Sequence, residues 1–236
     1  MVSGDSRVPI AVGAPKAEAA LLMVLSLIAG YVDTAGFLSL QGLFTAHVTG
    51  NFVTLGASLA FGSSGAIAKV LALPLFCLVV VATRLLNTVL SNRSRPALEI
   101  LIALEVLLLF IGAALAIRFG PFDDTNTWQA VLTGMALVGA MAVQNAVHRI
   151  HFGSAPPSTI MTGTTTQVMI DLAGRLYGHP GTGTESGARL RRMAATVLSF
   201  ATGCASAALL YGSLGMKCLL VPPVLGGVGL VLRLTD

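Results

Sequence analysis

The order of apolar and polar positions divides the chain into long hydrophobic segments separated by short polar ones. Six segments contain close to the roughly 20 mainly apolar residues that a helix needs to cross a bilayer. These segments are 19–41, 66–89, 97–117, 129–149, 192–213 and 217–234. Two further stretches, 47–62 and 159–176, are shorter and begin with polar, threonine-containing runs. The pattern predicts an all-α polytopic membrane helix bundle of about six spans, with two short re-entrant or broken helices.

Composition supports a membrane protein and excludes several other classes. Hydrophobic residues make up 55% of the 236 positions, charged residues 10%, and the mean hydropathy is +0.84. A soluble globular domain has about a quarter of its residues charged, so the lipid bilayer is the expected partner. The net charge of +4 is not gathered on a basic helix, and we expect no nucleic-acid partner. Residues 1–18 are expected to form a disordered cytoplasmic tail, and 19–236 a single transmembrane domain.

A short polar phrase occurs twice, at the start of the two shorter stretches. The copies are His47-Val48-Thr49-Gly50-Asn51 and Ile160-Met161-Thr162-Gly163-Thr164. Each copy follows a hydrophobic segment that contains a polar group of its own, Asp33 in the first case and Gln144 with Asn145 in the second. Polar side chains in a bilayer are costly unless they find partners or line a cavity, so each marks a candidate site. The recurrence predicts a duplicated site.

Several roles are open to these residues. Asp33 is a candidate for cation coordination, for proton carriage, or for holding the following loop by accepting N–H bonds. The threonines and glycines place hydroxyls and bare backbone at the start of a half-helix, where N–H groups can receive a ligand. The alternative is that they only let helices pack and bond to their own backbone. The candidate substrate or ion pathway residues are Asp33, Thr49, Gly50, Asn51, Gln144, Asn145, Thr162, Gly163 and Thr164.

Charged loop residues favour one of two topologies for the short stretches. Loop 90–96 and segment 175–192 are rich in arginine, whereas loop 118–128 contains two aspartates. If both short stretches cross the membrane, the two basic loops lie on opposite sides. If both are re-entrant, the basic loops and the N-terminal tail are all cytoplasmic, in agreement with the positive-inside rule. We prefer the re-entrant topology, and full crossing is the alternative.

The re-entrant topology predicts an internal repeat. Repeat one is 19–89 and repeat two is 129–213, with a linking helix at 97–117 and a final helix at 217–234. Because a single span joins the two repeats, the second is inverted relative to the first. Inverted repeats whose broken helices meet near the midplane are a recurring transporter design.

Two ion pairs are expected away from the duplicated site. Glu105 lies deep in the linking helix and is expected to pair with Arg84 as a structural lock. Asp171 and Arg175 are four residues apart, which is the spacing of a helical ion pair.

No metal, cofactor or enzymatic chemistry is indicated by the sequence. The three cysteines, Cys77, Cys204 and Cys218, have the spacing of no metal or redox motif. His148 and His151 lie at a helix end, where basic residues offset the helix dipole. Nucleotide-binding loops and nucleophile motifs are absent from the sequence. We therefore expect neither a cofactor nor an enzyme.

With these motifs the chain resembles the YoaK family of bacterial multi-pass membrane proteins, whose function is not established. The resemblance rests on Gly30-Tyr31-Val32-Asp33, on both polar phrases and on Gln144-Asn145, and it covers nearly all of 19–213. It implies an integral membrane protein of bacterial type with about six spans. In the second copy Thr164 stands where the first has Asn51, which argues against identical ligand chemistry in the two copies.

The leading hypothesis is a small-solute or ion transporter or channel in the bacterial plasma membrane, with a cytoplasmic N-terminus. In this hypothesis the duplicated polar residues line one central site. The alternative is a structural or accessory membrane protein whose polar residues stabilise the bundle or a partner complex. A homo-oligomer is compatible with both. An intramembrane enzyme would need a base and a nucleophile on facing helices, and only Asp33 with Thr49 offers such a pair.

Overall fold

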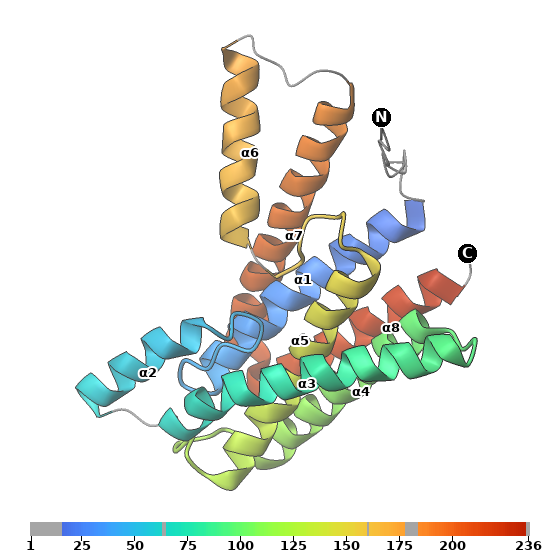
Figure 1. Ribbon diagram of the computed structural model, residues 1–236. Helices are drawn as coiled ribbons and strands as arrows, with labels where there is room; N and C mark the ends of the chain where they lie inside the picture. Colours follow the sequence, from blue (N-terminus) through green and yellow to red (C-terminus); the bar gives the residue numbers. More distant parts are fainter. Residues whose placement is uncertain (1–15, 63–64, 160, 178–183, 235–236) are drawn as a thin grey trace, which may run out of the picture.

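In the computed structural model, residues 16–62, 65–159, 161–177 and 184–234 are described, and within these ranges the chain forms helices and no strand. Figure 1 shows their arrangement. The helices are α1 (Lys16–Ser39), α2 (Gly50–Phe61), α3 (Ala66–Asn92), α4 (Ala97–Phe119), α5 (Trp128–His151), α6 (Met161–Leu176), α7 (Thr184–Leu214), the short 3₁₀ helix η1 (Gly215–Leu220) and α8 (Val221–Leu234). The predicted polytopic helix bundle is confirmed.

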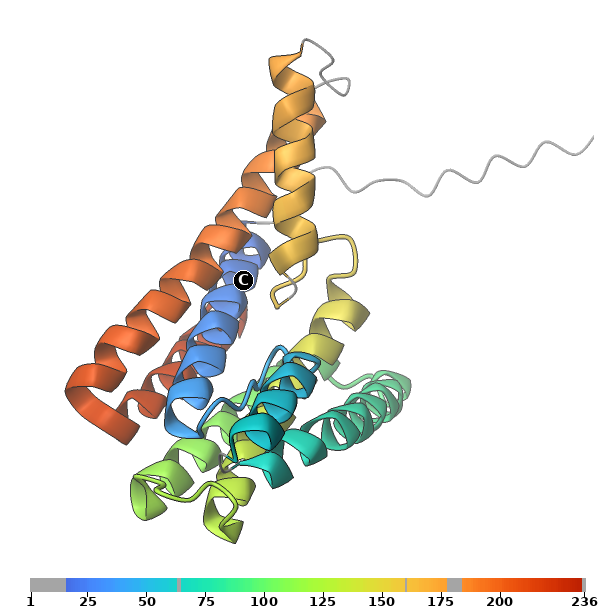
Figure 2. The ribbon, with the colours of Figure 1, turned by 90° about the vertical axis from the view of Figure 1, so that its left-hand side faces the viewer.

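The long hydrophobic segments expected from the sequence fall in helices, and the last two, 192–213 and 217–234, fall largely in one continuous apolar stretch. The described residues contain five stretches that are long and apolar enough to cross a bilayer, and the last runs from Gly187 to Val231. Within that last stretch the chain reverses direction at η1, so that α7 and α8 lie as two separate helices (Figures 1 and 2). Gly215 makes the reversal possible with a positive φ of 56°, which glycine adopts at little steric cost.

One helix boundary differs from the sequence-based expectation. The apolar pattern places the start of the fifth long segment at 192, but α7 begins at Thr184. The additional turns carry Arg189, whose guanidinium lies 2.8 Å from the carboxylate of Asp171 on α6. This contact joins α6 and the start of α7 in a helical hairpin (Figure 2), which a hydrophobicity pattern does not detect.

Helix contacts and directions relate the two halves of the chain. Helix α1 packs on α7 and α8, while α5 packs on α3 and α4; α2 packs on α3, and α6 packs on α7. If each helix of the first half is matched with the helix four positions later (α1 with α5, α2 with α6, and so on), each of these contacts corresponds to another contact in the same list. The members of each matched long pair run in opposite directions (Figures 1 and 2). Such a relation is what two inverted units would produce, and it extends to α4 and α8. The repeat bounds expected from the sequence, 19–89 and 129–213, stay a prediction.

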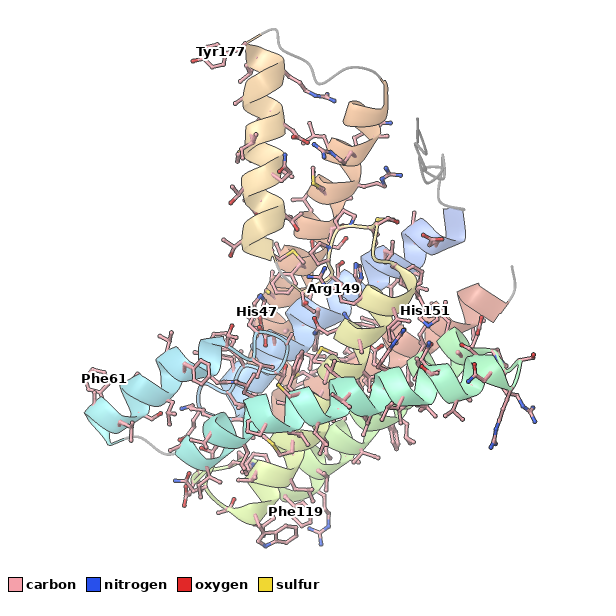
Figure 3. The ribbon with its side chains drawn as sticks, viewed as in Figure 1. His47, Phe61, Phe119, Arg149, His151 and Tyr177 are labelled. Atoms are coloured by element: carbon pink, nitrogen blue, oxygen red, sulfur yellow. The ribbon has the colours of Figure 1, made fainter. Side chains whose placement is uncertain are left out.

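The two short helices, α2 and α6, begin near the middle of the molecule and run away from each other. Figure 3 places His47, just before α2, at the centre, with Phe61 and Tyr177 at the far ends of the two helices. Helix α2 stops at Gly62, whose φ of 68° is left-handed, a common way for a helix to end. The backbone N–H of the nearby Gly65 donates to Asn126 at 3.1 Å. Helix α2 therefore ends beside loop 120–127, whereas α6 runs upward, away from that loop (Figure 1).

Two glycines allow α1 and α7 to cross with their backbones in contact. A Cβ atom on Gly30 would collide with the carbonyl oxygen of Phe200, and one on Gly203 would collide with the carbonyl oxygen of Leu27. Small residues at crossings are typical of membrane helix pairs, in which packing drives association. The crossing places α7 beside the middle of α1, where Asp33 lies.

Replacing Gly203 with alanine is therefore expected to separate α1 from α7. Overpacking of this kind costs about 1–3 kcal/mol, and we expect a clear fall in the thermal stability of the detergent-solubilised protein. Gly212 lies on the same helix, and a Cβ added there would meet no atom within 4 Å, so Gly212→Ala is the matched control. Equal melting temperatures for the two variants would contradict the close crossing.

Candidate functional site

Asp33 fixes the loop that leads into α2. Its Oδ1 accepts the backbone N–H groups of Thr45 and Ala46, both at 2.8 Å. Its Oδ2 lies 2.6 Å from Nδ1 of His47. The carboxylate is 5% exposed, and these donors supply the partners that a buried charge requires. Three roles were considered for Asp33, and the structure shows one of them directly: its carboxylate holds the following loop by accepting N–H bonds.

Asn51 closes the same loop from its other end. Its side-chain oxygen accepts the backbone N–H of Phe44, and its amide donates to the carbonyl oxygen of Phe44, both at 2.8 Å. A Cβ on Gly50 would lie 2.9 Å from the Phe44 ring, so a glycine lets the ring pack against the start of α2. The loop is thereby held on both the Asp33 side and the Asn51 side.

The N–H groups at the start of α2 are not free to bind a ligand. The N–H of Gly50 donates to the carbonyl of His47, that of Asn51 to Val48, and that of Phe52 to Thr49. These bonds form a tight first turn that uses the groups a helix start normally leaves open. The expectation that this helix start presents open amides is therefore wrong for these three residues, and ligand contacts here must come from side chains.

The second half contains the same type of contact at the same spacing. The Gln144 amide donates to the Ser158 hydroxyl at 3.1 Å, and the Thr159 hydroxyl donates to the Asn145 side-chain oxygen at 2.7 Å. Each pair is 14 residues apart, as are Asp33 and His47. In both halves, a polar side chain within a long helix holds the loop that precedes a short helix. The duplication is therefore a duplicated loop attachment.

The two loops meet at His47. Its imidazole lies beside the backbone of Thr159 in the second loop. The same ring lies edge-on to Phe200 of α7, with ring centroids 5.5 Å apart. His47, near the centre of the molecule in Figure 3, thus lies between α1, α7 and the second loop.

A cavity of about 650 Å³ opens beside this contact. Its lining contains an acidic group, an imidazole, two hydroxyls, a thiol and an aromatic wall. The lining residues are Asp33, Thr34, Phe37, Leu38, Phe44, His47, Thr49, Gly50, Phe200 and Cys204. Three of the sequence-based candidates, Asp33, Thr49 and Gly50, therefore share one cavity.

The remaining candidates lie elsewhere. Asn51, Gln144 and Asn145 bond to the loops behind the cavity. Thr162 lines a separate hollow along the face of α6. Thr164 is buried, while a Cβ on Gly163 would meet open space. None of the described residues of the second polar phrase, 161–164, lines the cavity beside Asp33.

Sequence reasoning assigned no role to His47 or to the contribution of α7. His47 belongs to the first repeated phrase, and its 14-residue distance from Asp33 was the available signal. Phe200 and Cys204 carried no signal, because a phenylalanine and a cysteine in an apolar helix resemble ordinary packing residues. Only the close crossing of α1 and α7 brings them to Asp33.

The two expected ion pairs are not formed as anticipated. Asp171 pairs with Arg189 of α7, not with Arg175 on its own helix. The hydrogen bond from Gln167, aided by Arg189, holds the pKa of Asp171 below its usual value. Glu105 is 1% exposed with no partner among the described residues for either carboxylate oxygen. Arg84 is exposed on α3, which packs mainly on α5 and only lightly on α4.

The helices and their paired loops define a polytopic α-helical membrane protein with a polar centre. The chain belongs to the family described as protein of unknown function DUF1275, whose model matches residues 21–232. It is similar to the UPF0700 transmembrane protein YoaK of Bacillus subtilis (strain 168), with 32% identity over 163 residues, which are 66% of this chain and 68% of that protein. No solved structure matches the chain. The resemblance inferred from the polar phrases is confirmed.

Proposed function

We propose that this membrane protein is a small-solute or ion transporter or channel whose central site is the cavity beside Asp33 and His47. The observation that carries the proposal is the ionisable pair itself. A carboxylate and an imidazole lie 2.6 Å apart between two loops, at the point where two short helices diverge. Ionisable groups inside membrane helices commonly mark substrate or ion pathways.

The arrangement of the short helices supports the same proposal. In many transporters, inverted units place broken helices at the midplane, and the substrate binds where they meet. Helices α2 and α6 begin near the centre and leave it in different directions, α6 upward and α2 to the left (Figure 3), and His47 of one loop lies beside the backbone of Thr159 in the other. The cavity lies at this meeting point.

The chemistry of the cavity limits what it would take. A volume of about 650 Å³ lies within the range of small-molecule sites, about 300–1,000 Å³. Hydroxyls of Thr34 and Thr49 and the His47 imidazole would bond a polar group, while Phe37 and Phe200 would cover an apolar one. The site suits a small solute with both characters, or a cation held near Asp33. We place the protein in the bacterial plasma membrane with its N-terminus in the cytoplasm, as the basic loops favour.

A structural or accessory role remains the second candidate, and a specific observation favours it. The hydrogen bonds of Asp33 and Asn51 go to the loop between α1 and α2. Residues that only attach loops would stabilise the bundle without passing any solute. Apolar side chains on α2 and α6, such as Phe61 and Ile170, are exposed, and they would face lipid or a second copy.

Cys204 provides a direct test, because it lines the cavity in the wild-type chain. In a Cys77→Ser, Cys218→Ser background, we expect Cys204 to react with a charged, water-soluble thiosulfonate in intact membranes. Asp33 variants that retain the fold should change the rate of that reaction. Mass spectrometry of the intact protein gives the extent of modification.

Cys77, retained in a separate Cys204→Ser, Cys218→Ser variant, provides the matched control. It is exposed on α3, in the middle of a helix suited to the membrane, so it should react with an apolar maleimide and not with the charged reagent. If Cys204 also resists the charged reagent in the folded protein, the cavity is not open to water. That outcome would favour the structural role.

A further inference from the structure

Four buried polar atoms lack a partner among the residues that the structure describes, and they lie on two helices, α4 and α5, that pack against each other. They are both carboxylate oxygens of Glu105 on α4, Oε1 of Gln144 and Nδ1 of His148 on α5. The three residues are 1%, 0% and 4% exposed. Buried polar groups in native structures are almost always bonded, so this group calls for an explanation beyond packing.

The geometry of α4 and α5 brings the three residues to neighbouring levels. A Cβ on Gly112 of α4 would lie 2.6 Å from Leu137 of α5, so these two positions face each other. The helices run in opposite directions (Figure 1). Seven residues back from Gly112 is Glu105, and seven residues on from Leu137 is Gln144. Seven residues are nearly two helical turns, so Glu105 and Gln144 also face each other.

His148 continues this line toward the end of α5. It lies one turn beyond Gln144, and residues four apart share a helix face. Figure 3 places the neighbouring labelled residues, Arg149 and His151, at that end of the helix. The three polar side chains therefore lead from one end of α5 to the buried carboxyl of α4.

The unpartnered atoms are all hydrogen-bond acceptors when Glu105 is ionised. Both hydrogens of the Gln144 amide have acceptors, the carbonyl of Leu25 at 2.9 Å and the hydroxyl of Ser158 at 3.1 Å. If Nε2 of His148 donates to the carbonyl of Ala155, 3.4 Å away, its Nδ1 is also an acceptor. The three side chains therefore lack a hydrogen-bond donor for these acceptors, and a protonated Glu105 carboxyl would provide one.

We propose that Glu105 is a proton-binding carboxyl group inside the bilayer, and that it exchanges its proton with the His148 end of α5. Ionisation would bury a charge with no donor beside it among the described residues, which is far more costly than burying the neutral acid. Asp33 is the contrasting case, since two backbone N–H groups and His47 surround its carboxylate. The proposal is independent of the solute cavity, because no residue of the group lines that cavity.

The titratable groups near Glu105 are few. Helix α5 contributes the buried His148, and its last turn also carries Arg149 and His151, which are exposed. The described part of α8 up to residue 231 has no charged side chain. Lys217 of η1 lies at the other end of α4, where Met216 approaches Gly120. Helix α3 carries Arg84, which is exposed, and Lys69, which bonds to Ser58 at 2.6 Å. Helix α4 itself carries Glu99, near its first turn, and Arg118, in its last turn. His148 is the buried titratable group that these elements bring to the α4 and α5 contact.

A membrane-soluble carbodiimide, dicyclohexylcarbodiimide, tests the proposal, because it reacts with protonated carboxyl groups in apolar surroundings. In native membranes containing the full-length protein, we expect it to modify Glu105, with labelling that declines as the pH is raised. Peptide mapping identifies the labelled residue without any substitution. Glu105→Gln should abolish the label, whereas the matched variant Glu99→Gln should retain it.

The exchange route has its own measurement. After a rapid jump from alkaline to acidic pH, His148→Leu should slow protonation of the Glu105 carboxyl by about tenfold or more, with the same final extent. The protonation is followed by the infrared absorbance of the carboxyl C=O, which is absent in Glu105→Gln. An unlabelled Glu105 at every pH would overturn the proposal. Protection by sodium or potassium ions at constant pH would also overturn it, since it would identify a metal cation as the ligand. An unchanged rate in His148→Leu would refute the route.

Discussion

Asp33→Ala is expected to prevent accumulation of the folded protein, whereas Asp33→Asn is expected to leave the fold largely intact. Alanine leaves the buried N–H groups of Thr45 and Ala46 without an acceptor. Each unsatisfied group costs about 1–3 kcal/mol, and the loss of the His47 contact adds to this. The sum is a large part of the roughly 5–15 kcal/mol that stabilises a typical protein. Folded yield is measured by size-exclusion chromatography of a fluorescent fusion.

The asparagine variant separates stability from function. Its side-chain oxygen can still accept both N–H bonds, and its amide can donate to a neutral His47, but the negative charge is gone. If the cavity is a transport site, flux should fall at least about tenfold, equivalent to about 1.4 kcal/mol, with folded yield retained. Flux of sodium, potassium and a panel of small neutral solutes is measured in proteoliposomes. Equal losses of yield and flux in Asp33→Asn would point to the structural role.

Reporters at Ser94 and Tyr177 are expected to lie on the same side of the membrane, with a reporter at Asp123 on the other side. All three positions are exposed, at the ends of helices or in connections. A re-entrant α6 returns the chain to the face from which it came, so only the spans α4 and α5 separate Ser94 from Tyr177, and two crossings restore the original side. The positive-inside rule puts this shared side in the cytoplasm. Paired phosphatase and fluorescent-protein fusions give an all-or-none result.

Full crossing makes the opposite prediction. If α2 and α6 each span the bilayer, Ser94 and Tyr177 report from different sides, and the two halves of the chain become parallel repeats. The length of α2, 12 residues, is short for a span of about 20 residues. Opposite reporter signals would nevertheless overturn the inverted arrangement inferred from helix directions.

The positions of helices could be predicted from the sequence because lipid imposes a strong pattern. A run of apolar residues long enough to cross a bilayer has few other stable conformations, and the helices α3, α4 and α5 match the expected segments to within about three residues. The duplicated polar phrase also located the two loops that meet at His47. Local pattern and local structure agree in these places, so the prediction needed no knowledge of neighbours.

Partners distant in sequence could not be predicted in the same way. Asp171 had an arginine at the right helical spacing, yet it bonds to Arg189 because α6 and α7 fold into a hairpin. The cavity needs Phe200 and Cys204, which reach Asp33 only through the Gly30 and Gly203 crossing. Glu105 was assigned an exposed partner because burial cannot be deduced from a uniformly apolar helix. Each of these errors concerns which helix faces which, and hydrophobicity alone does not encode that.

The crossing of α1 and α7 also has a mechanical consequence. Gly30 and Gly203 touch the opposing backbone, so if the two helices rock against each other, this point is the fulcrum. When a rigid helix rotates about its crossing point, residues far from that point move the most and residues near it move little. Asp33 lies three residues from Gly30, and Cys204 is adjacent to Gly203, so the floor of the cavity would stay fixed while the helix ends swing. Access to the cavity would then be governed by the two loops and the far ends of the two helices.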